Sequence, residues 1–513
     1  MTEPPGKPES LWLATSEHPG YPSLEDGLNV DVAVLGGGVV GLTTAALLKR
    51  QGATVAVIEA NRVGAGVTGH TTAKVSSLHG LIYASIESSF GRDGARIYGQ
   101  ANQAGLERTA KFVAELGIDC DFRRKDAFTY AEDPDDLGKI EDEVEAAQRA
   151  GLPASYSESC DLPFPIAGAV RFADQAEYHP RRYLLGLAAD IPGDGSHVFE
   201  GTRATGVSDA GPCRVETTGG AVTASDVVVA THAPFLDRGL FFARTHPERS
   251  YALAGRAGGG ELHGMYLSTE SPAHTVRTHP APGGGEYVIF GGESHKTGQG
   301  GDTAERYRRL IRWGEERLGV RSVEYHWSTQ DNMPIDGVPY VGKLTPISKG
   351  VWVATGFLKW GLTNGTAAAM MLSDEILGRS NPWSETFDSN RVKPLASAKE
   401  FVKENANVGR RFVVDHAAPA EVKSASEIPR GEGRILRGGV KKIAAYRDDS
   451  GVLHAVSAVC THLGCQVAWN PGERSWDCPC HGSRFDVDGE VLQGPAVDPL
   501  EPKPELTEKP AKA

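Results

Sequence analysis

Two short arms near the end of the chain hold the residues best suited to chemistry. They are Cys460-Thr-His462-Leu-Gly-Cys465 and Cys478-Pro-Cys480-His481-Gly-Ser483. A [2Fe–2S] cluster with two thiolates on one iron and two imidazoles on the other needs two loops of this kind. We predict that Cys460 and Cys478 hold one iron and that His462 and His481 hold the other. A zinc site built from the same residue types is the alternative.

These arms resemble the Rieske proteins of respiratory and photosynthetic cytochrome complexes. In that family the second cysteine of each arm joins the two loops, so the resemblance implies a disulfide between Cys465 and Cys480. Ser483 matches a hydrogen-bond donor to the cluster, but Phe485 stands where the family has a tyrosine. Because hydrogen bonds to cluster sulfur raise the reduction potential, we predict a potential below that of those proteins.

A glycine-rich turn near the N-terminus has the pattern of a dinucleotide site. An apolar run at 30–35 ends in Gly36, and a segment with helical spacing follows. Gly36 permits a tight turn, Gly38 lets the backbone approach a pyrophosphate, and Gly41 lets helix and strand pack closely. Glu59 ends the next apolar run and can accept hydrogen bonds from both ribose hydroxyls, which disfavours a 2′-phosphate. The alternative is an ordinary glycine-rich turn.

Four later segments resemble the family of D-amino-acid oxidase, glycine oxidase and sarcosine oxidase, and this resemblance favours FAD over NAD. The segments are 62–83, 177–187, 227–235 and 354–367. The resemblance implies that the flavin ring lies between the 64–74 loop and the 356–366 turn. Besides the fingerprint residues, the FAD contacts that it implies are Gly66, Thr68, Thr72, Ala230, Gly356, Gly361 and Thr363.

Polar side chains in or near these segments are candidates for the substrate side of the flavin. The catalytic candidates are Lys74, His79, Tyr251 and His295, with Tyr83 and Lys359 as further possible contacts. For such residues a packing or flavin-binding role is more common than catalysis. Amino-acid-oxidising relatives often place a basic residue where Thr363 stands, which argues against an α-amino acid as substrate.

The order of the two motif sets resembles bacterial two-module FAD oxidoreductases with a C-terminal Rieske domain. We predict a dehydrogenase in which a small amine-type substrate gives a hydride to FAD, and the cluster relays single electrons to an external acceptor. The alternatives are an electron-transfer or reductase component fed by NAD(P)H, a redox sensor, and an FAD oxidase that uses O2. A single convincing dinucleotide fingerprint disfavours the reductase.

Several other histidines and cysteines have simpler interpretations. His274 and His279 have the spacing of mononuclear iron ligands, but the position three residues before His274 lacks the carboxylate that such a site needs. Cys120, Cys160 and Cys213 have no ligand-type neighbours in sequence and are expected to be buried thiols.

The whole chain must position these two sites. Its 513 residues suit two or three domains, and a net charge of −13 argues against broad binding of nucleic acid or anionic membranes. No run of about 18 apolar residues and no leader segment is present, so we expect no membrane span and a cytoplasmic protein. The expected fold is an α/β FAD-binding module, Rossmann-like and of D-amino-acid-oxidase type, with a mixed-sheet substrate domain, followed by a small all-β Rieske domain.

The expected boundaries and elements follow from periodicity and composition. The domains are an extended N-terminal arm (1–28), an FAD-dependent oxidoreductase domain (29–379), a connector (380–415), the Rieske domain (416–505) and a tail (506–513). Helices are expected at 39–51, 93–116, 135–150 and 363–377, strands at 30–35, 54–58, 227–231, 286–291 and 351–355, and a short helix followed by a strand at 401–415.

Overall fold

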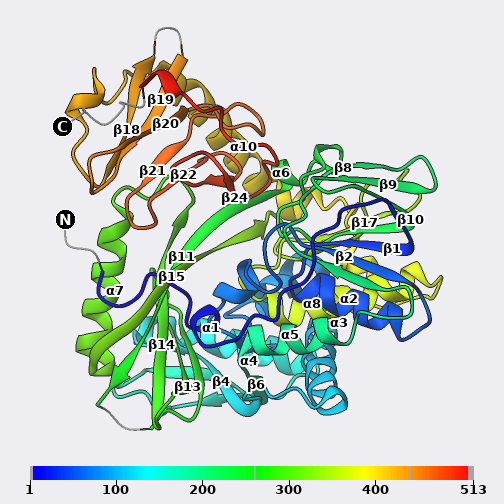
Figure 1. Cartoon of the computed structure of the whole chain (residues 1–513). Coiled ribbons are helices and arrows are strands. Elements are labelled where there is room, and N and C mark those ends of the chain that lie inside the picture. Colours follow the sequence, from blue (N-terminus) through cyan, green and yellow to red (C-terminus); the bar gives the residue numbers. More distant parts are fainter. Residues whose placement is uncertain (1–3, 259–260, 439–440, 507–513) are drawn as a thin grey trace.

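A mainly parallel sheet carries the glycine-rich turn (Figure 1). The structure is a computed structural model that describes residues 4–258, 261–438 and 441–506. The strands of this sheet are β1 (Leu28–Leu35), β2 (Val55–Ile58), β7 (His197–Phe199), β8 (Ala204–Ser208), β9 (Cys213–Thr217), β10 (Ala221–Val229), β16 (Tyr340–Lys343) and β17 (Val351–Thr355). Their order is β16-β17-β10-β1-β2-β7, with β9 and β8 attached to β10. Five of them, β17, β10, β1, β2 and β7, run parallel, as their apolar sequences predict.

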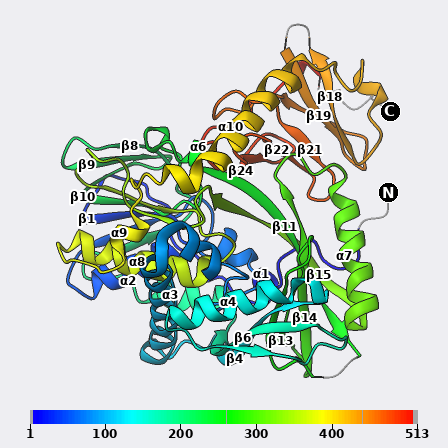
Figure 2. The same cartoon turned by 180° about the vertical axis from the view of Figure 1, so that it is seen from behind.

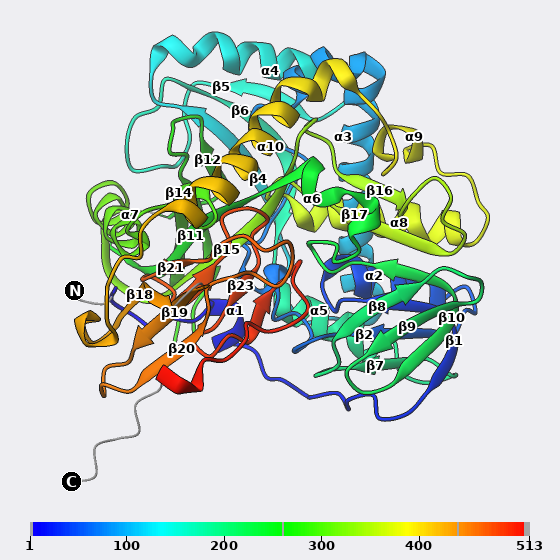
Figure 3. The ribbon, with the colours of Figure 1, turned by 90° about the horizontal axis from the view of Figure 1, so that it is seen from above.

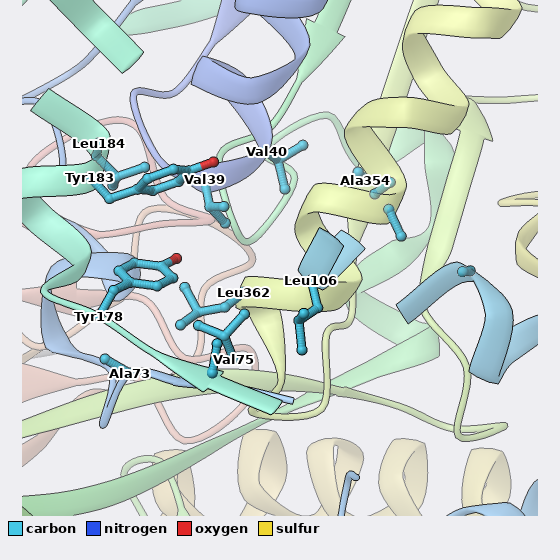
Figure 4. Close-up of a cluster of buried hydrophobic side chains, with 14 of the residues drawn as sticks. Val39, Val40, Ala73, Val75, Leu106, Tyr178, Tyr183, Leu184, Ala354 and Leu362 are labelled. Carbon is cyan, nitrogen blue, oxygen red and sulfur yellow. The ribbon is translucent and has the colours of Figure 1, made fainter. Parts of the chain in front are cut away.

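Helices pack this sheet against the rest of the FAD-binding body (Figure 2). They are α1 (Leu11–Ala14), α2 (Val39–Lys49), α3 (Tyr83–Leu116), α4 (Leu137–Arg149), α5 (Pro180–Ala189), α8 (Gly361–Ile376) and α9 (Ser384–Phe387). Figure 4 shows side chains from four of them gathered in one buried cluster, among them Val39, Leu106, Tyr183 and Leu362. Because these helices share one core, the start of α2 is held in a fixed position relative to the start of α8. The sequence predicts that both of these helix ends contact FAD.

A second, mixed sheet forms the other half of the body. Its order is β15-β11-β14-β13-β12-β4-β6-β3, with β5 paired to β6. One face packs under α7 (Thr303–Leu318) through Tyr251 and Leu253, whereas Ala252 and Trp327 on the other face belong to the core of the FAD-binding body. The strands are β3 (Lys74–Val75), β4 (Arg123–Ala131), β5 (Ala154–Ser157), β6 (Gly168–Glu177), β11 (Thr245–Ala257), β12 (Met265–Ser268), β13 (Thr275–Pro280), β14 (Glu286–Lys296) and β15 (Val320–Pro334).

The C-terminal part is a small all-β domain, reached through a long helix. Helix α10 (Pro394–Ala417) runs from the FAD-binding body to this domain (Figure 2) and crosses above the mixed sheet in the view from above (Figure 3). One small sheet has the order β18-β19-β20 and the other β21-β22-β23-β24. Their bounds are β18 (Glu432–Gly438), β19 (Lys441–Arg447), β20 (Leu453–Ser457), β21 (Ala468–Asn470), β22 (Ser475–Asp477), β23 (Arg484–Phe485) and β24 (Val491–Gln493).

Most of the expected elements are present, and two expectations need correction. The helix-then-strand expected at 401–415 is wrong, because this stretch lies inside α10. The apolar side chains Phe412, Val413 and Val414 are exposed on this helix, whereas Val408 packs against the core of the C-terminal domain. The N-terminal arm is not extended throughout, since it contains α1 with Leu11 and Trp12 buried. Among the described residues, no helix combines the length and the apolarity needed to cross a membrane.

Candidate active site and cluster site

The turn between β1 and α2 has room only for glycine at two positions. A Cβ on Gly36 would lie 2.5 Å from the carbonyl oxygen of Ala230, and one on Gly41 would lie 1.9 Å from that of Gly36. Gly38 is the N-cap of α2 and brings no side-chain acceptor to the helix end. The backbone of the first turn is therefore suited to hold a pyrophosphate through its N–H groups and the helix dipole.

Glu59 follows β2 and lies beside this turn. Its Oε2 accepts a hydrogen bond from the Gly37 N–H at 2.7 Å, and its Oε1 accepts one from the Asn61 N–H at 2.8 Å. Burial raises the pKa of Glu59, and these two bonds and the nearby Arg203 only partly oppose the rise. Each carboxylate oxygen keeps acceptor capacity for a ribose hydroxyl, so the residue fits its expected role.

Backbone strain marks three segments that the sequence placed near the flavin. Ala73, His232, Leu358 and Lys359 have φ of 60°, 64°, 56° and 71°. Non-glycine residues in this region of φ/ψ space cluster at binding and active sites. Two side chains fix the segment around His232, because Asn332 Nδ2 and Thr355 Oγ1 both donate to its carbonyl oxygen.

The other residues expected at FAD fall into the same surroundings. Gly66 is the N-cap of the short 3-10 helix Val67–His70, and Thr68 Oγ1 accepts from the Val39 N–H at the start of α2 at 3.4 Å. Thr72 is half-buried immediately before Ala73, Gly356 has φ +79° at the end of β17, and Gly361 is the first residue of α8. Their roles at the cofactor remain predictions.

Lys74 and His79 differ in what they could do. Lys74 Nζ donates to the Tyr266 carbonyl oxygen and to Thr275 Oγ1 and lies 5.4 Å from the centroid of the Trp360 ring. Burial, with Arg277 second, lowers the pKa of Lys74 to about 7. A lysine that is half neutral near pH 7 is suited to accept a proton.

His79 is hydrogen-bonded through both ring nitrogens. Its Nε2 donates to the Ser76 carbonyl oxygen at 2.7 Å, its Nδ1 accepts from Tyr98 OH at 2.7 Å, and its ring stacks on Trp360. Burial lowers the pKa of His79 to about 3, so the ring stays neutral. Thr363 Oγ1 also donates to the Ser76 carbonyl oxygen at 2.9 Å.

Tyr251 and His295 lie on the face of the mixed sheet that packs against α7, which does not support their predicted action on substrate. Tyr251 OH bonds His295 Nε2 at 2.9 Å, and Tyr251 packs edge-on against Tyr307 of α7. This is the α7 face of the mixed sheet, opposite the face that contacts the FAD-binding body. Burial lowers the pKa of His295 to about 4 and raises that of Tyr251.

The opposite face of the same strands carries polar residues that the sequence did not single out as a group. Lys359 Nζ pairs with Glu248 Oε2 at 3.0 Å and donates to Ser294 Oγ at 2.8 Å. The hydrogen bond from His246, together with Lys359, lowers the pKa of Glu248 to about 2 despite burial. Burial raises the pKa of the neighbouring Asp331 to about 6. Lys359 directly precedes Trp360, whose ring lies beside Lys74.

The C-terminal arms meet at one buried site. The Nδ1 atoms of His462 and His481 are buried and have no hydrogen-bond partner among the described residues, and the two ring centroids lie 5.0 Å apart. The Cys460 thiol hydrogen-bonds to that of Cys478, which lowers the pKa of Cys460, as do the His462 N–H and the Ser483 hydroxyl. Two thiols and two orphaned imidazole nitrogens are the donor set that a Rieske cluster requires.

The remaining two cysteines of the arms are bonded to each other. Cys465 and Cys480 form a disulfide, as the resemblance implied. The Sγ atom of Cys478 lies within 4.8 Å of both disulfide sulfurs, but bonded sulfurs are not free ligands, so we keep the predicted ligand set. Phe485 is fully buried and pairs with Trp476 across β22 and β23.

The cluster arms face the FAD-binding body. His462 Nε2 donates to Asp237 Oδ1 at 2.8 Å, and Gln330 Nε2 donates to the Gly482 carbonyl oxygen at 2.9 Å. Nearby, Arg249 pairs with Glu473 at 3.1 Å. The two modules are therefore joined by direct polar contacts as well as by the chain.

The residues that were set aside have structural surroundings. His274 stacks on Trp313, and burial lowers the pKa of His279 to about 2. Tyr83 OH donates to the Ser77 carbonyl oxygen. Of the free thiols in the first half, Cys120 and Cys213 are buried and Cys160 is partly exposed.

Comparisons with known proteins identify both modules. A family model described as FAD dependent oxidoreductase matches residues 31–375, more than half of the chain. The chain belongs to this family. A second model, the Rieske [2Fe-2S] domain, matches residues 418–504. The predicted fold and cofactors are thus confirmed: the protein is an FAD-dependent oxidoreductase that carries FAD and a [2Fe–2S] cluster rather than zinc.

Individual relatives agree with this assignment. The protein YhfW of Bacillus subtilis (strain 168), which is named as a Rieske 2Fe-2S iron–sulfur protein, is 36% identical over 497 residues, covering 96% of this chain and 97% of its own. Gamma-glutamylputrescine oxidoreductase of Escherichia coli (strain K12) is 29% identical over 231 residues, covering 44% of this chain and 54% of its own. The crystal structure of glycine oxidase from Geobacillus kaustophilus superposes with a TM-score of 0.60 at 18% identity, covering 71% of this chain and 99% of that one, and so shows the shared fold.

Proposed function

We propose that the protein is a dehydrogenase that oxidises a small-molecule amine and passes single electrons to an external acceptor. FAD supplies a hydride acceptor for the C–H bond next to the amine nitrogen, and the cluster supplies one-electron transfer. The substrate becomes an imine, which water hydrolyses to a carbonyl compound and the free amine. Two equivalents of a one-electron acceptor take up the two electrons.

The contact between the modules carries this proposal. The arm with His462 lies against Asp237 of the FAD-binding body, at 2.8 Å between Nε2 and Oδ1. An oxidase that gave its electrons straight to O2 would have no use for a cluster held there. The amine is supported by the similarity to gamma-glutamylputrescine oxidoreductase and by the shared fold of glycine oxidase.

Within the site, we assign Lys74 to proton handling. An amine is a hydride donor only when its nitrogen is neutral, so the substrate ammonium must lose a proton first. Lys74 Nζ, with a pKa near 7, can take that proton, and Trp360 beside it gives the substrate an aromatic wall. A cytoplasmic location stays a prediction.

The test is anaerobic reduction with a panel of amines and with NADH, followed by optical and EPR spectra. Flavin bleaching by an amine, with a reduced-cluster EPR signal appearing afterwards, is the expected result. Reduction by NADH alone would replace the proposal with a reductase component. Flavin bleaching without any cluster signal would refute the relay.

A further inference from the structure

The FAD-binding body covers the side of the cluster site that His462 and His481 form, which we call the histidine edge. The His462 side chain is 5% exposed and donates from Nε2 to Asp237 Oδ1. Phe242 lies edge-on to both ligand rings, with centroids 5.9 Å from His462 and 5.3 Å from His481. Asp237 and Phe242 both belong to the short segment between β10 and β11, so one piece of the body contacts both imidazoles.

The glycine of the second arm shows how closely the two modules approach. A Cβ on Gly482 would lie 2.5 Å from Gln330 Nε2 and 2.6 Å from Pro247 Cβ, and Gly482 also has φ +80°. Gln299 Nε2 donates to the Pro479 carbonyl oxygen at 2.9 Å in the same arm. The histidine edge therefore packs closely against the FAD-binding body of the same chain.

We propose that Asp237 is a positioning residue for the cluster: its carboxylate holds the His462 imidazole against the FAD-binding body and lowers the reduction potential of the cluster. The inference rests on the proposed relay, because it names the edge through which electrons would enter. A carboxylate that accepts from the outer nitrogen of a ligand imidazole makes that ligand a stronger donor to the metal. The negative charge also opposes the gain of an electron, and both effects act in the same direction.

The test measures the midpoint potential of the cluster by EPR in the full chain, titrated with dithionite and redox mediators. In Asp237→Asn, which keeps an oxygen acceptor but loses the charge, we expect an upward shift of the potential and altered g-values. Asp237→Glu keeps the charge and should hold the potential below that of Asp237→Asn. Glu490→Gln removes an exposed carboxylate from the Rieske domain and should leave both readouts unchanged.

Three results would overturn the proposal. They are an unchanged potential in Asp237→Asn, an equal shift in Glu490→Gln, and a potential in Asp237→Glu that matches the asparagine variant. Iron and sulfide contents equal to those of the wild type show that each variant carries its cluster. Because the titration uses no substrate, a wrong amine assignment leaves its outcome untouched, and failure of the relay appears only in the amine reduction experiment.

Discussion

The Arg249–Glu473 pair should contribute a large part of the free energy that holds the two modules together. The Arg249 side chain is 2% exposed, and Glu473, 19% exposed, also accepts from Tyr307 OH at 2.6 Å. Removing one partner of a buried pair costs about 3–5 kcal/mol, and we take about 3 kcal/mol because Glu473 is partly screened by solvent. Glu473→Gln should therefore increase the population of the opened interface on the order of 100-fold.

Native-state hydrogen exchange of the amides in 470–477 measures this opening. Faster exchange by that factor in Glu473→Gln, and wild-type exchange in Glu427→Gln, which removes an exposed carboxylate of the Rieske domain, is the expected pattern. Burial alone would raise the pKa of Glu473, but Arg249 and Arg484 lower it overall. The docking energy is thus present above the usual carboxyl pKa and is lost as pH falls through the lowered one. Exchange rates within about 3-fold of the wild type would refute this reasoning.

Three further predictions concern the cofactor sites and the proton acceptor. Gly41→Ala should purify with little FAD, measured as flavin per chain, because its Cβ would overlap Gly36, whereas Gly138→Ala in open space on α4 should bind FAD normally. In the wild type, amine-driven flavin reduction should rise with pH through about 7 as Lys74 becomes neutral, and Lys74→Met should be slower by about 100-fold and lack this rise. Cys478→Ser should lose the cluster EPR signal but keep its flavin spectrum, and a retained signal would show that the ligand set is wrong.

Short-range motifs could be interpreted from sequence because their geometry is local. Gly41 is constrained by the carbonyl oxygen of Gly36 in the same turn, and each cluster arm fits within six residues, whereas the atom that restricts Gly36 belongs to the distant Ala230. The contact of His462 with Asp237 joins positions 225 residues apart, and no local pattern signals it. The turn that contains Asp237 has no motif of its own, so only the folded chain reveals its role.

The placement of His295 has a specific structural cause. Strand residues alternate between faces, and Tyr251 follows the plain alternation of β11, but the pairing of β11 with β14 shifts register between Arg249 and Tyr251. Gly292 and His295 of β14 pair with Tyr251 and Arg249, so β14 carries an extra residue there, and His295 points to α7 while Ser294 faces Lys359. Periodicity alone cannot locate a bulge that depends on the partner strand.

The helical connector bears on whether the Rieske domain must move during electron transfer. A flexible 380–415 segment would have let the Rieske domain move between a flavin-side and an acceptor-side position. Instead α10 is held at the body by Asn405 Nδ2, which donates to the Ala243 carbonyl oxygen, and by the Lys296–Glu404 pair. Swinging the domain away would break these contacts together with the Arg249–Glu473 pair. The geometry therefore favours transfer at a fixed separation, with an outside acceptor approaching a face of the Rieske domain other than the histidine edge.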